Sequence, residues 1–215
     1  MEVIQVKNRS VVFRSNVAEW DLNLHVILGS RFNYVIDTGL GSLSVEPVKE
    51  LLRNSPRPVV VVNTHHHWDH VWGNCAFPDS VIVSHRLCRE RIASRWDAMM
   101  ERNGRFLRGD ARMCLPNLVF EDSLYFPDDG VRLLHTPGHT TDSISVLDEE
   151  DGVLNAGDNI GDTMDEILPS IETDRDAYIG ILLKCKALEF DACISGHNIV
   201  LGKEILDTIL RSMSE

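Results

Sequence analysis

The sequence predicts an α/β fold, because short apolar runs typical of strands alternate with stretches that have the pattern of helices. The clearest strand covers residues 59–63, whose sequence VVVVN is typical of a strand that is buried on both faces. Helical patterns occur at residues 47–52, 87–103 and 178–188. In addition, four apolar strands end in a histidine or an aspartate. Functional residues gather at such strand ends when helices cover the faces of a sheet.

Length and composition fit one large domain that spans positions 1–215. Of the 215 residues, 43% are hydrophobic and 25% are charged, which is ordinary for a globular protein with a substantial core. The chain has 33 acidic and 21 basic residues and a formal net charge of -12, which disfavours nucleic acid as a partner. We therefore expect a small-molecule substrate, and the oligomeric state stays open.

No targeting or membrane-spanning signal stands out in the sequence. The N-terminus lacks a basic stretch followed by an apolar one, and no apolar run approaches the ~20 residues that cross a bilayer. The five cysteines, at positions 75, 88, 114, 185 and 193, form no C-x-x-C pair, so we expect reduced and mostly buried thiols. These features predict a cytoplasmic protein without a membrane partner.

The first third of the chain predicts antiparallel strands. They are expected at 11–13, 22–28 and 34–37. Gly29-Ser30 is suited to the hairpin between the last two of them. Further along the chain, the pattern predicts a strand at 81–84 and a last helix from about Leu201.

The segment at about 86–116 supports two interpretations. Its helical part carries Trp96, Met99 and Met100 at positions that suit the core-facing side of an amphipathic helix. Its glycine breaks and methionines also suit a lid over a substrate site, in which the arginines would hold an acidic leaving group. A helical lid insertion is therefore the alternative to a core helix here.

One short stretch, THHHWDH at residues 64–70, concentrates metal-ligand types at the spacing H-x-H-x-D-H. Residues two apart on an extended segment point to the same side, so alternate side chains face together and the last histidine turns in beside them. The candidate ligands are His65, His67, Asp69 and His70. Imidazoles and a carboxylate without thiolates suit a catalytic zinc, iron or manganese site. By the same alternation, His66 points away.

Three later strands end in single candidate ligands. These are His139 after the strand at 131–135, Asp158 after the strand at 153–156 and His197 after the strand at 192–194. A glycine precedes each of them, which allows a sharp turn or a close approach of the backbone. Each feature alone is commonplace, but its repetition at four strand ends indicates one shared site.

With these residues in view, the chain resembles the metallo-β-lactamase superfamily along essentially its whole length. The matching features, in family order, are Asp-Thr-Gly at 37–39, H-x-H-x-D-H at 65–70, Pro-Gly-His at 137–139, Gly-Asp at 157–158 and Gly-His at 196–197. The resemblance implies a four-layer αββα sandwich whose two sheets meet at the edge that holds the metals.

The same resemblance implies a role for each candidate residue. It assigns His65, His67 and His139 to one divalent ion and Asp69, His70 and His197 to a second, with Asp158 bridging both. Asp37 would contact one of the ligands and would not bind a metal itself. Zinc is the first expectation for the two ions, with iron or manganese as alternatives.

The resemblance also implies hydrolysis, in which a hydroxide that bridges the two metals attacks the substrate. Asp69 is the expected catalytic residue, because it would orient this hydroxide and pass its proton to the leaving group. The string THHHWDH is most similar to the glyoxalase II type of hydroxyacylglutathione hydrolase. This similarity favours a thioester, a lactone or another activated ester as the substrate.

Two other functions remain as alternatives. Persulfide dioxygenases keep this fold but bind one iron through the equivalents of His65, His139 and Asp158. A phosphodiesterase or nuclease is disfavoured by the acidic charge of the chain. The number and identity of the bound metals separate the hydrolase from the dioxygenase.

Overall fold

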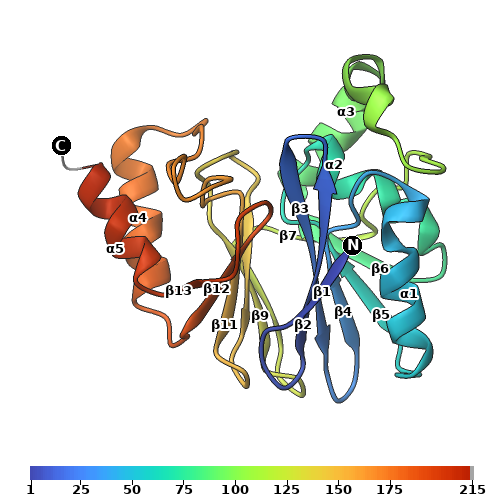
Figure 1. The fold of residues 1–215 in the computed structure, drawn as a ribbon, viewed down its shortest axis with the longest axis horizontal. Coiled ribbons are helices and arrows are strands. Elements are labelled where there is room, and N and C mark those ends of the chain that lie inside the picture. The colour runs from blue at the N-terminus through green and yellow to red at the C-terminus, as the bar shows by residue number, and fades with distance from the viewer. Residues whose placement is uncertain (214–215) are drawn as a thin grey trace.

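The computed structural model describes residues 1–213, in which two β-sheets stack face to face between two layers of helices (Figure 1). Within these residues, the first sheet has seven strands in the order β1 (Glu2–Gln5), β2 (Ser10–Val17), β3 (Trp20–Leu28), β4 (Asn33–Ile36), β5 (Val59–Val62), β6 (Val81–His85) and β7 (Leu118–Phe120). The second has six described strands in the order β13 (Leu201–Gly202), β12 (Ala192–Ser195), β11 (Val153–Gly157), β10 (Ile144–Asp148), β9 (Val131–His135) and β8 (Ser123–Phe126). The predicted four-layer αββα sandwich is confirmed.

The helices divide between the two outer faces of the sandwich (Figure 1). On the side of the first sheet lie α1 (Glu46–Arg53), α2 (Trp68–Val71) and α3 (Arg86–Asn103), with the 3₁₀ helices η1 (Ser42–Val45), η2 (Trp72–Ala76) and η3 (Gly104–Phe106). On the side of the second sheet lie α4 (Arg175–Lys186) and α5 (Ile205–Ser212). Over the described part of the chain, no helix has both the length and the apolar composition to cross a bilayer.

Strand direction changes within each sheet, and this sets where the loops gather. The first four strands form an antiparallel meander, whereas β4, β5, β6 and β7 are parallel to one another. In the second sheet β11 and β12 are the parallel pair. Parallel neighbours end at the same edge of a sheet, so the loops that follow β4, β5, β11 and β12 can converge.

The core between the sheets is apolar, and β5 has buried side chains on both of its own faces. Val60 and Val62 pack in the cluster between the sheets, whereas Val61 packs with Val48 of α1 on the outer face. Fully burying each such side chain stabilises the fold by about 1.5–3 kcal/mol. The prediction that this strand is buried on both faces is confirmed. All five cysteines are free and four of them are buried, as expected.

Helix α3 has a core face and an exposed face. Cys88, Ile92 and Met99 are buried against Val71 and Trp72 of the neighbouring helical turns. Partly buried Trp96 and Met100 pack against the same cluster. The core interpretation of the segment at 86–116 therefore applies to this face of the helix. Other α3 residues, described with the site, face a cavity.

The expected start of the last helix at about Leu201 is wrong. Leu201 pairs with Cys193 in the antiparallel ladder between β13 and β12, and its side chain is buried in the cluster under α4 and α5. Helix α5 begins only at Ile205. Leu201 continues the apolar pattern of the following helix, so periodicity alone did not distinguish the edge strand from the helix.

Candidate metal centre

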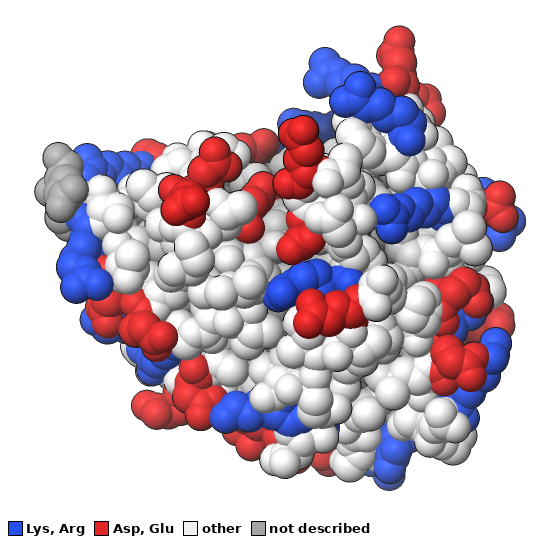
Figure 2. All heavy atoms as spheres, in the orientation of Figure 1, with Lys and Arg blue, Asp and Glu red and all other residues white. Residues whose placement is uncertain are grey.

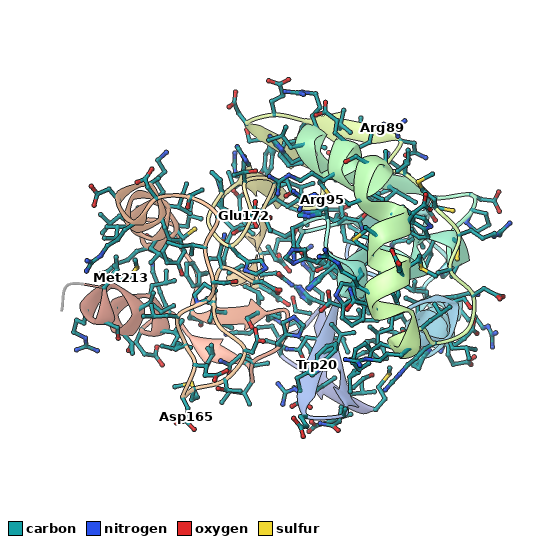
Figure 3. The ribbon with its side chains drawn as sticks, turned by 90° about the horizontal axis from the view of Figure 1, so that it is seen from above. Trp20, Arg89, Arg95, Asp165, Glu172 and Met213 are labelled. Carbon is teal, nitrogen blue, oxygen red and sulfur yellow. The ribbon has the colours of Figure 1, made fainter. Side chains whose placement is uncertain are left out.

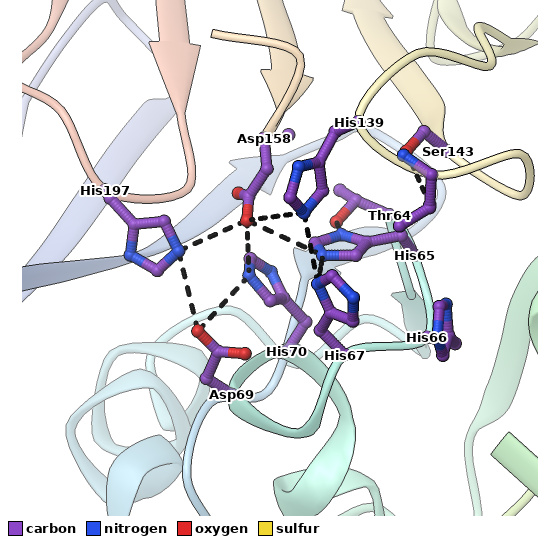
Figure 4. Close-up of polar contacts among 12 residues, drawn as sticks. Thr64, His65, His66, His67, Asp69, His70, His139, Ser143, Asp158 and His197 are labelled. Atoms are coloured by element: carbon purple, nitrogen blue, oxygen red, sulfur yellow. Dashed lines mark hydrogen bonds and ion pairs between the residues drawn. The ribbon is translucent and has the colours of Figure 1, made fainter. Parts of the chain in front are cut away.

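The seven candidate ligands lie together because the segments that carry them leave the sheets at one edge (Figure 4). Four of them belong to the stretch that follows β5, and the others follow β9, β11 and β12. Asp158 and His197 are neighbours because β11 and β12 are parallel and end together. Every sequence-predicted site residue is therefore found in this cluster.

The ligand atoms form two groups that share Asp158. Within each group these atoms lie within 4.8 Å of one another, and the groups are His65, His67, His139 and Asp158, and Asp69, His70 and His197. The Oδ2 atom of Asp158 also lies 3.3 Å from Nε2 of His70 and 3.3 Å from Nε2 of His197. Asp158 therefore lies close to residues of both groups.

Hydrogen bonds outside the cluster fix which nitrogen of each imidazole faces inward. In three of the rings Nδ1 is the donor. His70 donates to Oδ2 of Asp37 (2.8 Å), His139 to the carbonyl of Ser170 (2.8 Å) and His197 to the carbonyl of Asp21 (2.7 Å). In its neutral form each imidazole carries only one N–H, so Nε2 of each ring would then present a lone pair to the cluster. Metal-bound histidines use this arrangement of an outer acceptor and an inner ligand nitrogen.

The protein itself pairs several of these inward-facing atoms poorly. Nδ1 of His67 lies 2.9 Å from Nε2 of His65 and 3.1 Å from Nε2 of His139, so three ring nitrogens converge on one point. Among the described residues, Nε2 of His70 and Oδ1 of Asp158 are buried without a hydrogen-bond partner. Cations satisfy converging imidazole nitrogens and buried polar atoms that have no partner, so this set of residues fits divalent metal ions.

Burial and charge set the protonation of the ligands. Burial holds the pKa of His65 well below its usual value and, with His66 nearby, lowers the pKa of His67 to about 3, so both are neutral and able to bind metal. Burial would also lower the pKa of His197, but the Asp158 carboxylate outweighs it and raises this pKa to about 9. A metal that binds His197 at neutral pH therefore displaces a proton.

Gly196, which precedes His197, has a steric reason to be glycine. A Cβ atom at this position would lie 2.1 Å from Oδ1 of Asp158 and 2.8 Å from Cε1 of His70. No side chain fits at this distance without moving the carboxylate between the two groups. Glycine at this position therefore allows Asp158 and His70 to take the positions that they have in the cluster.

Thr64 supports the cluster, although no role is predicted for it from sequence. Its hydroxyl donates to Oδ2 of Asp37 (2.7 Å), and this leaves the hydroxyl oxygen to accept from Nδ1 of His65 (3.1 Å). Nε2 of His65 is thereby directed into the cluster. The only signal in the sequence is that Thr64 begins the stretch that carries the ligands.

His66 faces away from the ligands, as its alternation with them predicts. Its Nδ1 donates to Oδ1 of Asp142 (2.9 Å), and its Nε2 accepts from Nη1 of Arg95 (3.1 Å). Asp142 is a further residue to which the sequence assigned no role, whereas Arg95 is one of the arginines that the lid interpretation expected to hold an acidic leaving group. Asp142 lies three positions after His139, in a string that the sequence singled out for the histidine alone.

A cavity of about 300 Å³ opens in front of the ligands. Ligands from both groups line it, and so do Trp68 and residues of the segment at 161–170, including Asp162, Glu166 and Leu168. Seen from above, α3 lies on one side of the cluster and the segment that carries Asp165 and Glu172 on the other (Figure 3). The centre is therefore accessible to a small molecule.

Comparison with known proteins identifies relatives of this chain. It is 30% identical over 164 residues to the acyl-coenzyme A thioesterase MBLAC2 of Bos taurus and 27% identical over 148 residues to the hydroxyacylglutathione hydrolase of Rhodopseudomonas palustris (strain BisA53). Each alignment covers 65% of this chain, with 58% of MBLAC2 and 52% of the hydroxyacylglutathione hydrolase. The chain thus spans little more than half the length of these relatives.

The fold is similar to that of a metallo-beta-lactamase from Erythrobacter litoralis, with a TM-score of 0.77 at 18% identity over 99% of this chain and 95% of that one. This likeness concerns the fold alone. In sequence, residues 21–197 match the profile of the Metallo-beta-lactamase superfamily, and they include every candidate ligand. By this match over most of its length, the chain belongs to the metallo-beta-lactamase superfamily.

Proposed function

We propose that this chain is a hydrolase that uses two divalent metal ions, zinc before iron or manganese, to cleave a thioester or another activated ester. The observation that carries the proposal is the position of Asp158 between two groups of ligands. Two relatives are named as a thioesterase and a hydroxyacylglutathione hydrolase, which supports a thioester. The cavity of about 300 Å³ suits a small molecule.

The residues divide between two ion positions. His65, His67 and His139 would hold the first ion, Asp69, His70 and His197 the second, and Asp158 both. When bound, the ions supply a hydroxide nucleophile at neutral pH, because a metal lowers the pKa of water to about 7. Five neutral imidazoles and two carboxylates leave such ions only partly neutralised, so they can still polarise a carbonyl.

Asp69 is the residue best placed to move a proton. Its carboxylate lines the cavity, and its Oδ2 lies 3.5 Å from Nε2 of His197, so Oδ1 remains available. In thioester hydrolysis a water oxygen bonds to the carbonyl carbon, the C–S bond breaks and the leaving sulfur needs a proton. Asp69 would accept a water proton at Oδ1 and deliver it to the leaving thiolate.

Metal content measured together with turnover tests this proposal. The purified protein should hold two metal ions per chain, and chelation should abolish thiol release from a thioester panel until zinc, manganese or iron is restored. His70→Ala should reduce the stoichiometry from two towards one, since His70 belongs to the second group only. Thiol release that persists in fully metal-free protein would refute the proposal.

The same measurement separates the hydrolase from the dioxygenase. A mononuclear iron site that uses His65, His139 and Asp158 would hold one iron in both the wild type and His70→Ala. That result, together with oxygen consumption on addition of a persulfide, would refute the hydrolase proposal and support a dioxygenase function. The second ligand group supports the dinuclear alternative, because its atoms converge as closely as those of the first.

A further inference from the structure

A second cavity, of about 470 Å³, lies beside the metal centre and is bordered by α3. It shares His67 and Trp68 with the first cavity, so the two are contiguous at the ligands. The rest of its lining consists of His66 and five residues of α3, which are Arg95, Ala98, Met99, Arg102 and Asn103. The exposed face of α3 thus brings two guanidinium groups to the edge of the centre.

Neither Arg95 nor Arg102 pairs with a carboxylate among the described residues. Arg95 bonds to Nε2 of His66, and Arg102 has no hydrogen bond or ion pair within residues 1–213. Positions three and four residues away from each on the helix carry no acidic side chain. By contrast, Arg86 and Arg91 of the same helix pair with Glu121 and Glu172. In a chain with 33 acidic and 21 basic residues, this leaves two cations available to a ligand.

A buried pair holds Arg95 in place. His66 and Asp142 are 1% and 0% exposed, and Nδ1 of His66 donates to Asp142, so Nε2 of His66 can only accept. Arg91 approaches the same carboxylate at 3.3 Å and neutralises it further. Pairing with each other lowers the cost of burying this carboxylate and this imidazole. Here the pairing orients an acceptor towards Arg95 at the cavity wall.

The two cavities differ in charge. Asp162 and Glu166 line the first, whereas Arg95 and Arg102 line the second, which has no acidic residue in its lining. Figure 2 shows basic side chains where α3 lies in Figure 1, and acidic side chains along the upper edge beside them. An anionic group would therefore be attracted to the second cavity.

We propose that the second cavity binds an anionic group, a carboxylate or a phosphate, of the substrate whose thioester reaches the metal centre. Arg102 and Arg95 donate charge-assisted hydrogen bonds to this group, and Met99 and Trp68 contact the carbon chain that joins it to the reacting carbonyl. The proposal rests on the hydrolase function, and it names the substrate class as anionic thioesters.

Matched thioesters test the anion site by turnover. One pair is a glutaryl thioester and its carboxamide analogue, which place the charge on the acyl group. The other is acetyl phosphopantetheine and acetyl pantetheine, which place it on the thiol. At least one charged member should be preferred by about tenfold or more in kcat/KM, mainly through KM. Arg102→Gln should remove this preference, and the loss should fall on the charged member.

Arg86→Gln is the control, because it removes the same charge from the far end of α3. Among the described residues Arg86 bonds only to Glu90 and Glu121, and it lies 16 positions before Arg102, about 24 Å along a helix. This variant should keep the preference. Equal rates for the charged and neutral members of both pairs in the wild type would overturn the anion site. So would an equal loss on both members in Arg102→Gln.

Calorimetry with non-hydrolysable thioether analogues separates the two proposals. Metal-loaded wild type and Arg86→Gln should bind the charged analogue more tightly, and the difference should shrink at high salt and vanish in Arg102→Gln. Charge-dependent binding without any turnover would support the anion site and refute the hydrolase. Turnover without charge-dependent binding would refute the anion site and leave the hydrolase standing.

Discussion

Asp37 holds His70 in its metal-facing orientation, with Oδ2 of Asp37 2.8 Å from Nδ1 of His70. The same carboxylate accepts from the backbone N–H of Thr64 (2.7 Å) and from its hydroxyl (2.7 Å). Asp37 has a φ of 62°, a left-handed conformation that Asp, Asn and Gly adopt more readily than other residues. One carboxylate therefore connects the end of β4 with the stretch of ligands that follows β5.

Asp37→Asn should weaken metal binding by about 10–100-fold, the usual cost of losing such a supporting carboxylate. Asparagine tolerates the left-handed backbone, so the loop conformation is kept. Its amide has no charge to polarise the imidazole and only one acceptor atom for Thr64 and His70. Competition between the protein and a chromophoric zinc chelator measures the change.

Asp129→Asn is the matched control for this substitution. Asp129 is also buried and accepts from three backbone N–H groups and from the hydroxyl of Tyr34, but it precedes β9, whereas His139 follows the other end of that strand. It should lower the free energy of unfolding and leave zinc affinity unchanged. If both variants lose zinc affinity to the same degree, Asp37 has no specific role at the centre.

Two adjacent histidines should respond differently to substitution. His66→Gln should leave metal content intact, because His66 faces Asp142 and Arg95 and not the ligands. His67→Ala should lose metal, because Nδ1 of His67 lies at the point where three nitrogens converge. Metal per chain, measured after dialysis, decides between these outcomes. An equal loss in both variants would show that the assignment of the two faces is wrong.

The fold and the ligands follow from local sequence to different extents. The spacing within THHHWDH fixes which side chains share a face, so the orientation of His66 and its neighbours is predictable from the period of an extended chain. The Asp142–His66 pair spans 76 residues, and the approach of Arg95 depends on how α3 packs through Ile92 and Met99. Such contacts exist only in the tertiary structure, because no local pattern encodes them.

The edge strands of the sheets were not predictable for a related reason. β1 is exposed or half-buried at every position, and β13 has only two residues. β1 has only two apolar residues and β13 is too short to display a period, whereas β5 has an apolar residue at each of its four positions. Short edge strands form because a neighbouring strand is already in place to pair with them.

The two faces of α3 should respond differently to truncation. Ile92→Ala removes a fully buried side chain from the cluster with Val71 and Trp72 and should lower the free energy of unfolding by about 2–5 kcal/mol. Ser94→Ala, on an exposed position of the same helix, should change it by no more than about 0.5 kcal/mol. Urea denaturation of the metal-loaded variants measures both. Similar values for the two would show that this face of α3 adds little to the core.

His25 should make stability depend on pH, because burial lowers its pKa from 6.5 to about 3. The unfolded chain binds a proton at His25 below about pH 6.5, whereas the folded chain does so only near pH 3. The contribution of His25 to the free energy of unfolding is thus fully present above pH 6.5. It is lost as the pH falls towards 3, by about 1.4 kcal/mol per pH unit. His25 is 0% exposed, and its Nε2 has no hydrogen-bond partner among the described residues.

His25→Leu removes the titrating group while keeping a buried side chain of similar size. The imidazole leaves Nε2 without a hydrogen-bond partner among the described residues. At pH 7 the free energy of unfolding of the variant should therefore equal that of the wild type or exceed it by up to about 1 kcal/mol. Between pH 6.5 and 4.5, the free energy of unfolding of both proteins should fall with pH. The slope of the variant should be smaller than that of the wild type by about 1.4 kcal/mol per pH unit. Urea denaturation at each pH, with metal-free protein throughout, gives the two slopes. Parallel slopes for the wild type and His25→Leu would mean that His25 is protonated, or solvated, in the folded chain.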